Sequence, residues 1–177
     1  MPVIVADSID TALAALAAHP GATVIAGGTD LMVEVNEGRR TLADVVAVGR
    51  VPELAGVRVD GDELVIGATA TFAQLELPPT AALAPALAYA ARTVGSPQIR
   101  NGATIGGNLA TASPAGDSLP VLVALGARVA LAGPDGPVKP VQDYTLAVPN
   151  VDVAQDHQLG SISPGRDAPG RLRGEAR

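Results

Sequence analysis

The sequence contains no cysteine among its 177 residues, and this absence removes several classes of chemistry at once. Disulfide bonds, thiol nucleophiles, iron–sulfur clusters and cysteine-rich zinc sites all need a sulfur that the chain cannot supply. Its two histidines, His19 and His157, are too few for a three-histidine metal site built within one chain.

Aromatic residues and positive charge are also scarce. The chain has no Trp, one Phe and two Tyr, which is too few for the stacking platforms that hold single-stranded nucleic acids. Its 12 Lys and Arg against 18 Asp and Glu give a net charge of −6, so neither nucleic acid nor an anionic membrane is an expected partner. No apolar run reaches the roughly 18 residues of a membrane span. Residues 1–7 lack the features of a signal peptide, so we expect a cytoplasmic protein.

The residues that are present predict a globular protein with both helices and strands. Hydrophobic residues make up 47% of the chain. Ser8 as N-cap and the apolar spacing after it predict a helix over residues 8–19. Short apolar runs predict strands at 24–26 and 42–48, and alternation around an Asp-Gly turn predicts a hairpin at 57–67.

Later segments differ in character. We expect helices at residues 31–35, 71–75, 81–92 and 118–125, and a strand at 128–131 that enters a hairpin through the turn at 133–136. Between these elements, residues 94–117 are small, polar and glycine-rich, which predicts a long irregular segment with a functional role. The tail from residue 150 has few large apolar side chains and is expected to be disordered.

Two Gly-Gly pairs are the strongest candidates for a binding site. Gly27-Gly28 lies between a predicted strand and a predicted helix, where backbone N–H groups can bind an anion without a cationic side chain. Gly106-Gly107 lies in the irregular segment, where glycine lets the backbone approach a ligand closely. Each pair can also be an ordinary tight turn. Neither fits a dinucleotide-binding G-x-G-x-x-G or a P-loop.

Other polar residues support enzymatic chemistry less well. Ser113 and Asp117 suggest a hydrolase, but the sequence has no G-x-S-x-G elbow and no suitably placed histidine. Asp117 can be explained as a helix N-cap, and Arg100 as a structural hydrogen-bond donor.

Segments 24–31 (VIAGGTDL) and 99–117 closely resemble the FAD-binding medium subunit of the molybdenum hydroxylases, the family of carbon monoxide dehydrogenase and xanthine dehydrogenase. The resemblance covers about residues 2–145. It implies an α+β fold, a two-lobed FAD-binding domain of the vanillyl-alcohol oxidase (PCMH) type. That domain would occupy residues 1–147, with a first lobe at about 1–55 and a second at about 56–147. A divergent tail at 148–177 would follow, with the family's C-terminal domain absent.

The resemblance also implies which residues bind the cofactor. The residues expected around the FAD pyrophosphate are Val24, Ile25, Ala26, Gly27, Gly28, Thr29, Asp30 and Leu31. The residues expected on the flavin and ribityl side are Val94, Thr104, Ile105, Gly106, Gly107, Asn108 and Asp117. No catalytic residue and no metal ligand is expected in this chain.

The role that the resemblance implies is electron transfer. Substrate would be oxidised in a molybdopterin-binding large subunit, and a small subunit with 2Fe–2S clusters would pass electrons to FAD within a heterotrimer. FAD would then reduce an external acceptor. Two alternatives stay open: a truncated, non-catalytic remnant or docking module that binds FAD weakly or not at all, and a flavoprotein that acts alone.

Overall fold

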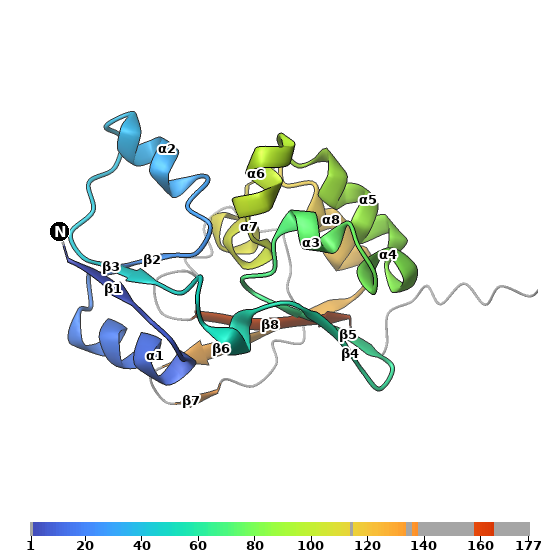
Figure 1. The fold of residues 1–177 in the computed structure, drawn as a ribbon, viewed down its shortest axis with the longest axis horizontal. Helices are drawn as coiled ribbons and strands as arrows, with labels where there is room; N and C mark the ends of the chain where they lie inside the picture. The colour runs from blue at the N-terminus through green and yellow to red at the C-terminus, as the bar shows by residue number, and fades with distance from the viewer. Residues whose placement is uncertain (1, 114, 134–135, 138–157, 165–177) are drawn as a thin grey trace, which may run out of the picture.

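The computed structural model describes residues 2–113, 115–133, 136–137 and 158–164. The N-terminal part forms a three-stranded parallel sheet in the order β1-β3-β2 (Figure 1). Its strands are β1 (Val3–Val5), β2 (Thr23–Ile25) and β3 (Val45–Ala47). Strand β3 lies within the predicted strand at 42–48, and β2 overlaps the predicted strand at 24–26, shifted by one residue toward the N-terminus. The edge strand β1 is an addition.

Helix α1 (Ile9–Ala18) begins where the sequence predicts it. The Ser8 hydroxyl accepts a hydrogen bond from the Thr11 N–H (3.1 Å), and the Thr11 hydroxyl accepts one from the Ser8 N–H (3.0 Å). This reciprocal cap pairs two backbone donors that the first turn of a helix leaves free. The helix contributes to a first hydrophobic cluster that consists of Ala6, Ala12, Val46, Val48, Val51, Leu54 and Ala68.

The second sheet is antiparallel and has five strands in the order β4-β5-β8-β6-β7. Strands β4 (Val57–Asp60) and β5 (Glu63–Gly67) form the predicted hairpin, in which Asp60 pairs with Glu63 across a two-residue turn. Gly61 in this turn has a φ of 58°, a conformation that favours glycine. Strand β6 (Ala127–Gly133) pairs with β7 (Gly136–Pro137), which confirms the last predicted hairpin.

The central strand of this sheet comes from the predicted disordered tail. Strand β8 (Gln158–Pro164) pairs with β5 and β6 together, and Ile162 is in register with Ile66 on one side and Val129 on the other. The prediction of disorder is therefore wrong for these residues. Without β8, strands β5 and β6 would each present an unpaired edge. The remaining residues of the tail, and the expected domain end at residue 147, lie outside the described residues.

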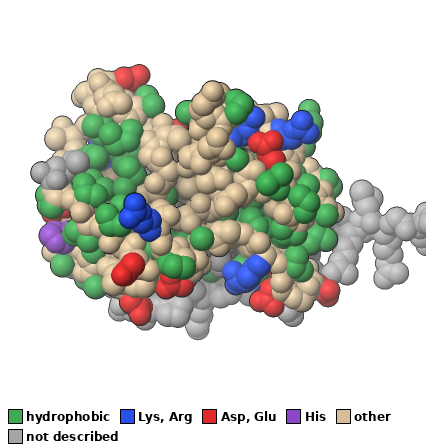
Figure 2. Space-filling view, in the orientation of Figure 1, with side chains coloured by type: hydrophobic (Ala, Val, Ile, Leu, Met, Phe, Trp, Pro, Cys, Tyr) green, Lys and Arg blue, Asp and Glu red, His purple; other side chains and the backbone are tan. Residues whose placement is uncertain are grey.

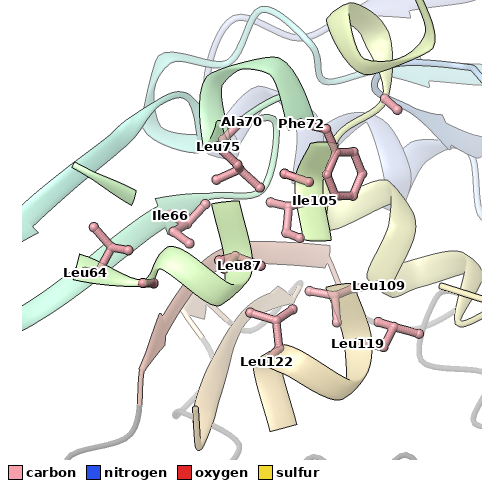
Figure 3. Close-up of a cluster of buried hydrophobic side chains, with 13 residues drawn as sticks. Leu64, Ile66, Ala70, Phe72, Leu75, Leu87, Ile105, Leu109, Leu119 and Leu122 are labelled. Atoms are coloured by element: carbon pink, nitrogen blue, oxygen red, sulfur yellow. The ribbon is translucent and has the colours of Figure 1, made fainter. Parts of the chain in front are cut away.

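Helices cover one face of the second sheet (Figure 1). Their bounds are α3 (Phe72–Leu75), α4 (Thr80–Leu83), α5 (Pro85–Thr93), α6 (Pro97–Gly102), α7 (Ile105–Thr111) and α8 (Ser118–Ala124). The helix predicted at 81–92 is thus two helices, because Pro85 begins a new one. Helices and sheet enclose a second hydrophobic cluster: Leu64, Ile66, Ala70, Phe72, Leu75, Ala84, Leu87, Ala91, Ala103, Ile105, Leu109, Leu119 and Leu122 (Figure 3).

The segment predicted to be irregular contains two short helices, so that prediction is wrong for α6 and α7. Each helix begins at a capping side chain. The Ser96 hydroxyl accepts from the Ile99 N–H (3.3 Å), and the Thr104 hydroxyl accepts from the Gly107 N–H (3.1 Å). Small residues dilute the apolar periodicity that marks a longer helix, so the local signals that remain are the two caps and Pro97 at the first position of α6.

Candidate functional site

The two glycine-rich segments lie against each other. A Cβ added at Gly27 would lie 2.7 Å from the carbonyl carbon of Gly102 and closer still to its oxygen, so the two backbones are in direct contact. The Thr111 hydroxyl donates to Asp30 Oδ2 (3.4 Å), which joins the same segments a second time. The loop that follows β2 and helix α7 are neighbours in Figure 1 as well. Segments 24–31 and 99–117, far apart in sequence, therefore form one surface.

The loop between β2 and helix α2 (Leu31–Asn36) presents free backbone donors. Among the described residues, the N–H groups of residues 27–31 donate to no acceptor. The next N–H, that of Met32, is already paired with the Gly28 carbonyl oxygen (3.0 Å). Gly28 adopts a φ of 71°, which lets the chain turn from strand into helix. Consecutive unpaired N–H groups at such a turn form a site for an anion.

The second Gly-Gly pair uses its backbone differently. The N–H of Ile105 donates to Ala70 O (3.0 Å) and that of Gly106 to Ala68 O (2.9 Å), so these groups hold α7 onto the chain before α3. A Cβ at Gly106 would lie 2.6 Å from Ala68 O. Gly107 is exposed, and a Cβ there would approach only the Thr104 hydroxyl, at 2.9 Å. Of the two glycines in this pair, Gly106 is therefore packed against Ala68, and Gly107 is the one exposed at the surface.

The end of α5 and the start of α8 bring Thr93, the neighbour of Val94, to Asp117. Val94 follows the last residue of α5, Thr93. The Thr93 hydroxyl shares its hydrogen between Ala90 O (2.7 Å) and Asp117 Oδ2 (2.9 Å). Asp117 occupies the N-cap position of α8, as the sequence predicts, but its side chain makes no capping hydrogen bond to the helix. Asp117 is exposed at this surface, with one carboxylate oxygen bound to Thr93.

Arg100 holds the turn after Val94 in place, which confirms its interpretation as a structural donor. Its guanidinium donates to Glu76 Oε1 (2.7 Å) and to the carbonyl oxygens of Val94 (3.2 Å) and Gly95 (3.1 Å). Only 15% of the Arg100 side chain is exposed. Because one cation satisfies three acceptors, the turn, α3 and α6 are tied together.

Replacing Arg100 with Met is therefore expected to lower the free energy of unfolding by about 2 kcal/mol, since it leaves Glu76 without its cation and two carbonyls without their donor. Urea denaturation measures this change. Arg92→Met, at an exposed position of α5, is the matched control and is expected to change stability by less than about 0.5 kcal/mol. Equal losses of stability in the two variants would contradict the role of Arg100 in holding the turn, α3 and α6 together.

The surface around these loops has no concentration of basic side chains. In Figure 2, Lys and Arg side chains lie scattered on the visible face, with acidic side chains beside several of them. In the part of the chain that the structure describes, no group of three His, Asp or Glu side chains could hold a metal ion. Within the same residues, no helix is long and apolar enough to cross a membrane. The unpaired backbone N–H groups at 27–31 are thus the main groups on this surface that could bind an anion.

Comparison with known families gives the decisive observation. Residues 1–163 match the family described as the FAD binding domain in molybdopterin dehydrogenase. The chain belongs to this family. It is accordingly an FAD-binding domain of the PCMH type with an α+β fold, and the family consists of oxidoreductase components.

Individual relatives agree with the family assignment. The nicotinate dehydrogenase FAD-subunit of Eubacterium barkeri is 45% identical over 109 residues, which cover 61% of this chain and 37% of the relative. Subunit alpha of the 6-hydroxypseudooxynicotine dehydrogenase complex of Paenarthrobacter nicotinovorans is 36% identical over 164 residues, 92% of this chain and 53% of the relative. The chain therefore spans about half the length, or less, of these relatives.

A solved structure matches nearly the whole FAD-binding domain. Carbon monoxide dehydrogenase from Hydrogenophaga pseudoflava superimposes with a TM-score of 0.82 at 28% sequence identity. The match covers 96% of this chain and 60% of that chain. A cofactor that carries a pyrophosphate also fits the free N–H groups at residues 27–31.

Proposed function

We propose that this FAD-binding domain relays electrons within a molybdenum-containing hydroxylase or dehydrogenase. A partner subunit with molybdopterin would oxidise the substrate, and a second partner with 2Fe–2S clusters would deliver the electrons. When bound, FAD supplies the redox chemistry that accepts these electrons and passes them to an external acceptor. The observation that carries the proposal is the run of unpaired N–H donors at 27–31, placed against segment 99–117. The cytoplasmic location remains a prediction.

The first loop would hold the FAD pyrophosphate through its backbone. A hydrogen bond to a charged group contributes roughly 1.5–3 kcal/mol, so a few of these donors could supply much of a micromolar affinity after binding costs. This arrangement explains how a protein of net charge −6 can bind a dianion. Val24, Ile25 and Ala26, which are also predicted to contact the cofactor, directly precede these donors. Leu31 carries the last N–H group of the run.

The second segment would line the flavin and ribityl portion. Gly107 and Asn108 lie on the accessible side of α7, while Thr104 is buried and caps the helix. Ile105 is fully buried and Gly106 is buried, so any role of these two residues in binding is to support the loop. Asp117 would offer its second carboxylate oxygen as an acceptor for a cofactor hydroxyl or N–H group.

The relay is tested by purifying the tagged chain from its native cells. We expect flavin, molybdenum and iron in the same complex by mass spectrometry, and bleaching of the flavin absorption when substrate is added without an acceptor. A complex that contains flavin but neither metal would contradict the relay. A chain that keeps its partners but lacks flavin would favour the docking-module alternative, which the family match does not favour.

Gly107→Val tests the second segment directly. We expect the FAD dissociation constant to rise at least about tenfold, since the side chain would extend into the free space beside α7, whereas the fold should persist. Displacement of the Thr104 hydroxyl should lower stability by about 1 kcal/mol. Titration of flavin fluorescence gives the affinity, and urea denaturation gives the stability. Gly21→Val, where a Cβ would have nothing within 4 Å, is the control. If Gly107→Val bound FAD as tightly as the parent, α7 would not line the cofactor site.

A further inference from the structure

A buried hydroxyl lies directly behind the candidate flavin surface. Ser118, the first residue of α8, has 0% of its surface exposed. Its Oγ lies 2.6 Å from Oδ1 of Asn108 on α7. Because an amide oxygen only accepts hydrogen bonds, the Ser118 hydroxyl donates to it. The Asn108 oxygen is therefore turned toward α8.

The other end of the Asn108 amide is left free. Within the described residues, Nδ2 donates to no acceptor, although the side chain is half-buried. In the described part of the chain, the buried side-chain polar atoms that lack a partner are Thr80 Oγ1 and Arg128 Nε. Asn108 Nδ2 is not one of them, because it is in contact with solvent. Asn108 directly follows Gly107, the exposed glycine of the second segment. A hydrogen-bond donor thus stands at the predicted cofactor surface.

The orientation of this amide is not arbitrary. If the Asn108 amide turned by half a rotation, Nδ2 would face Ser118 Oγ and the hydroxyl hydrogen would lose its acceptor. Among the described residues, Asn108 Oδ1 is the acceptor to which the Ser118 hydroxyl is hydrogen-bonded. A buried donor without a partner is unfavourable, so the observed rotamer is preferred.

We propose that Ser118 is a positioning residue for FAD: its hydroxyl orients the Asn108 amide so that Nδ2 donates to an acceptor atom of the flavin or ribityl portion. This inference rests on the proposed cofactor site. Ser118 does not touch the cofactor, and its whole effect on binding passes through Asn108. A residue that only stabilises α8 would not have this property.

A double-mutant cycle on FAD affinity separates the two roles. We expect Ser118→Ala and Asn108→Ala each to raise the FAD dissociation constant about five- to twentyfold. The double variant should bind no more weakly than Asn108→Ala alone, since the hydroxyl then has nothing to orient. Fully multiplicative effects of the two substitutions would overturn the proposal. Thermal unfolding of each variant without FAD records the structural contribution separately.

Asn108→Asp gives the sharper measurement. The aspartate keeps an oxygen for Ser118 to bind, but it replaces the outward donor with an acceptor that carries charge. We expect FAD to bind at least as weakly as in Asn108→Ala, with a melting temperature near that of the parent. Parent-like affinity would overturn the proposal while leaving the FAD site intact. Absence of saturable FAD binding by the parent would overturn the site and the proposal together.

Discussion

Gly27→Ala is expected to weaken FAD binding by about a hundredfold or more, although it adds one methyl group. That methyl group would overlap the backbone carbonyl of Gly102, with the carbonyl carbon only 2.7 Å away. A backbone atom cannot rotate aside as a side chain does, so segments 24–31 and 99–117 must separate. The N–H donors at 27–31 would then no longer face the second segment. Titration of flavin fluorescence measures the affinity.

The control is Gly21→Ala, where the new methyl group would have nothing within 4 Å. This variant should bind FAD as the parent does. Overpacking of this kind also costs roughly 1–3 kcal/mol of stability, so urea denaturation should accompany the titration. Parent-like affinity in Gly27→Ala would mean that the contact between the segments is not needed to build the site.

Phe72→Ala is expected to lower the free energy of unfolding by about 3–5 kcal/mol, the range for removing a buried aromatic side chain. Phe72 is 1% exposed and lies beside Ile105 in the second hydrophobic cluster (Figure 3). Its N–H donates to Ala103 O (3.0 Å), so the residue joins α3 to the chain just before α7. Urea denaturation measures the loss of stability.

Two variants serve as controls for this substitution. Phe72→Leu keeps most of the volume and should cost clearly less than Phe72→Ala. Tyr89→Ala removes an aromatic ring that is 70% exposed on α5, and we expect it to change stability by about 0.5 kcal/mol or less. Similar losses for Phe72→Ala and Tyr89→Ala would contradict the central place of Phe72 in the cluster.

Local signals allowed much of the architecture to be predicted from the sequence. Ser8 marks the start of α1, and the Asp-Gly turn at residues 60–61 marks the hairpin of β4 and β5. Strand β8 could not be found in this way. Its partners β5 and β6 lie far away in sequence, and the segment 158–164 has too weak an alternation to predict a strand by itself.

The candidate site could be located but not understood from the sequence alone. Both glycine pairs looked equivalent, since each can free the backbone for a ligand. In the structure, Gly27 and Gly106 instead allow two parts of the protein to touch. The N–H groups of Gly106 and Gly107 are paired, whereas those of Gly27 and Gly28 donate to no acceptor among the described residues. Ser118 gave no signal at all, because a serine after an aspartate looks like part of an ordinary helix start. Its burial is visible only after folding.

The position of β8 also has a consequence for how the protein is made. On the ribosome, residues 63–67 and 127–133 emerge well before residues 158–164, yet those last residues join the two halves of the sheet. Until β8 is synthesised, the nascent chain therefore carries two hairpins that each have an open edge. Open edges of this kind are where non-native association begins, so chaperone engagement is to be expected during synthesis of this domain.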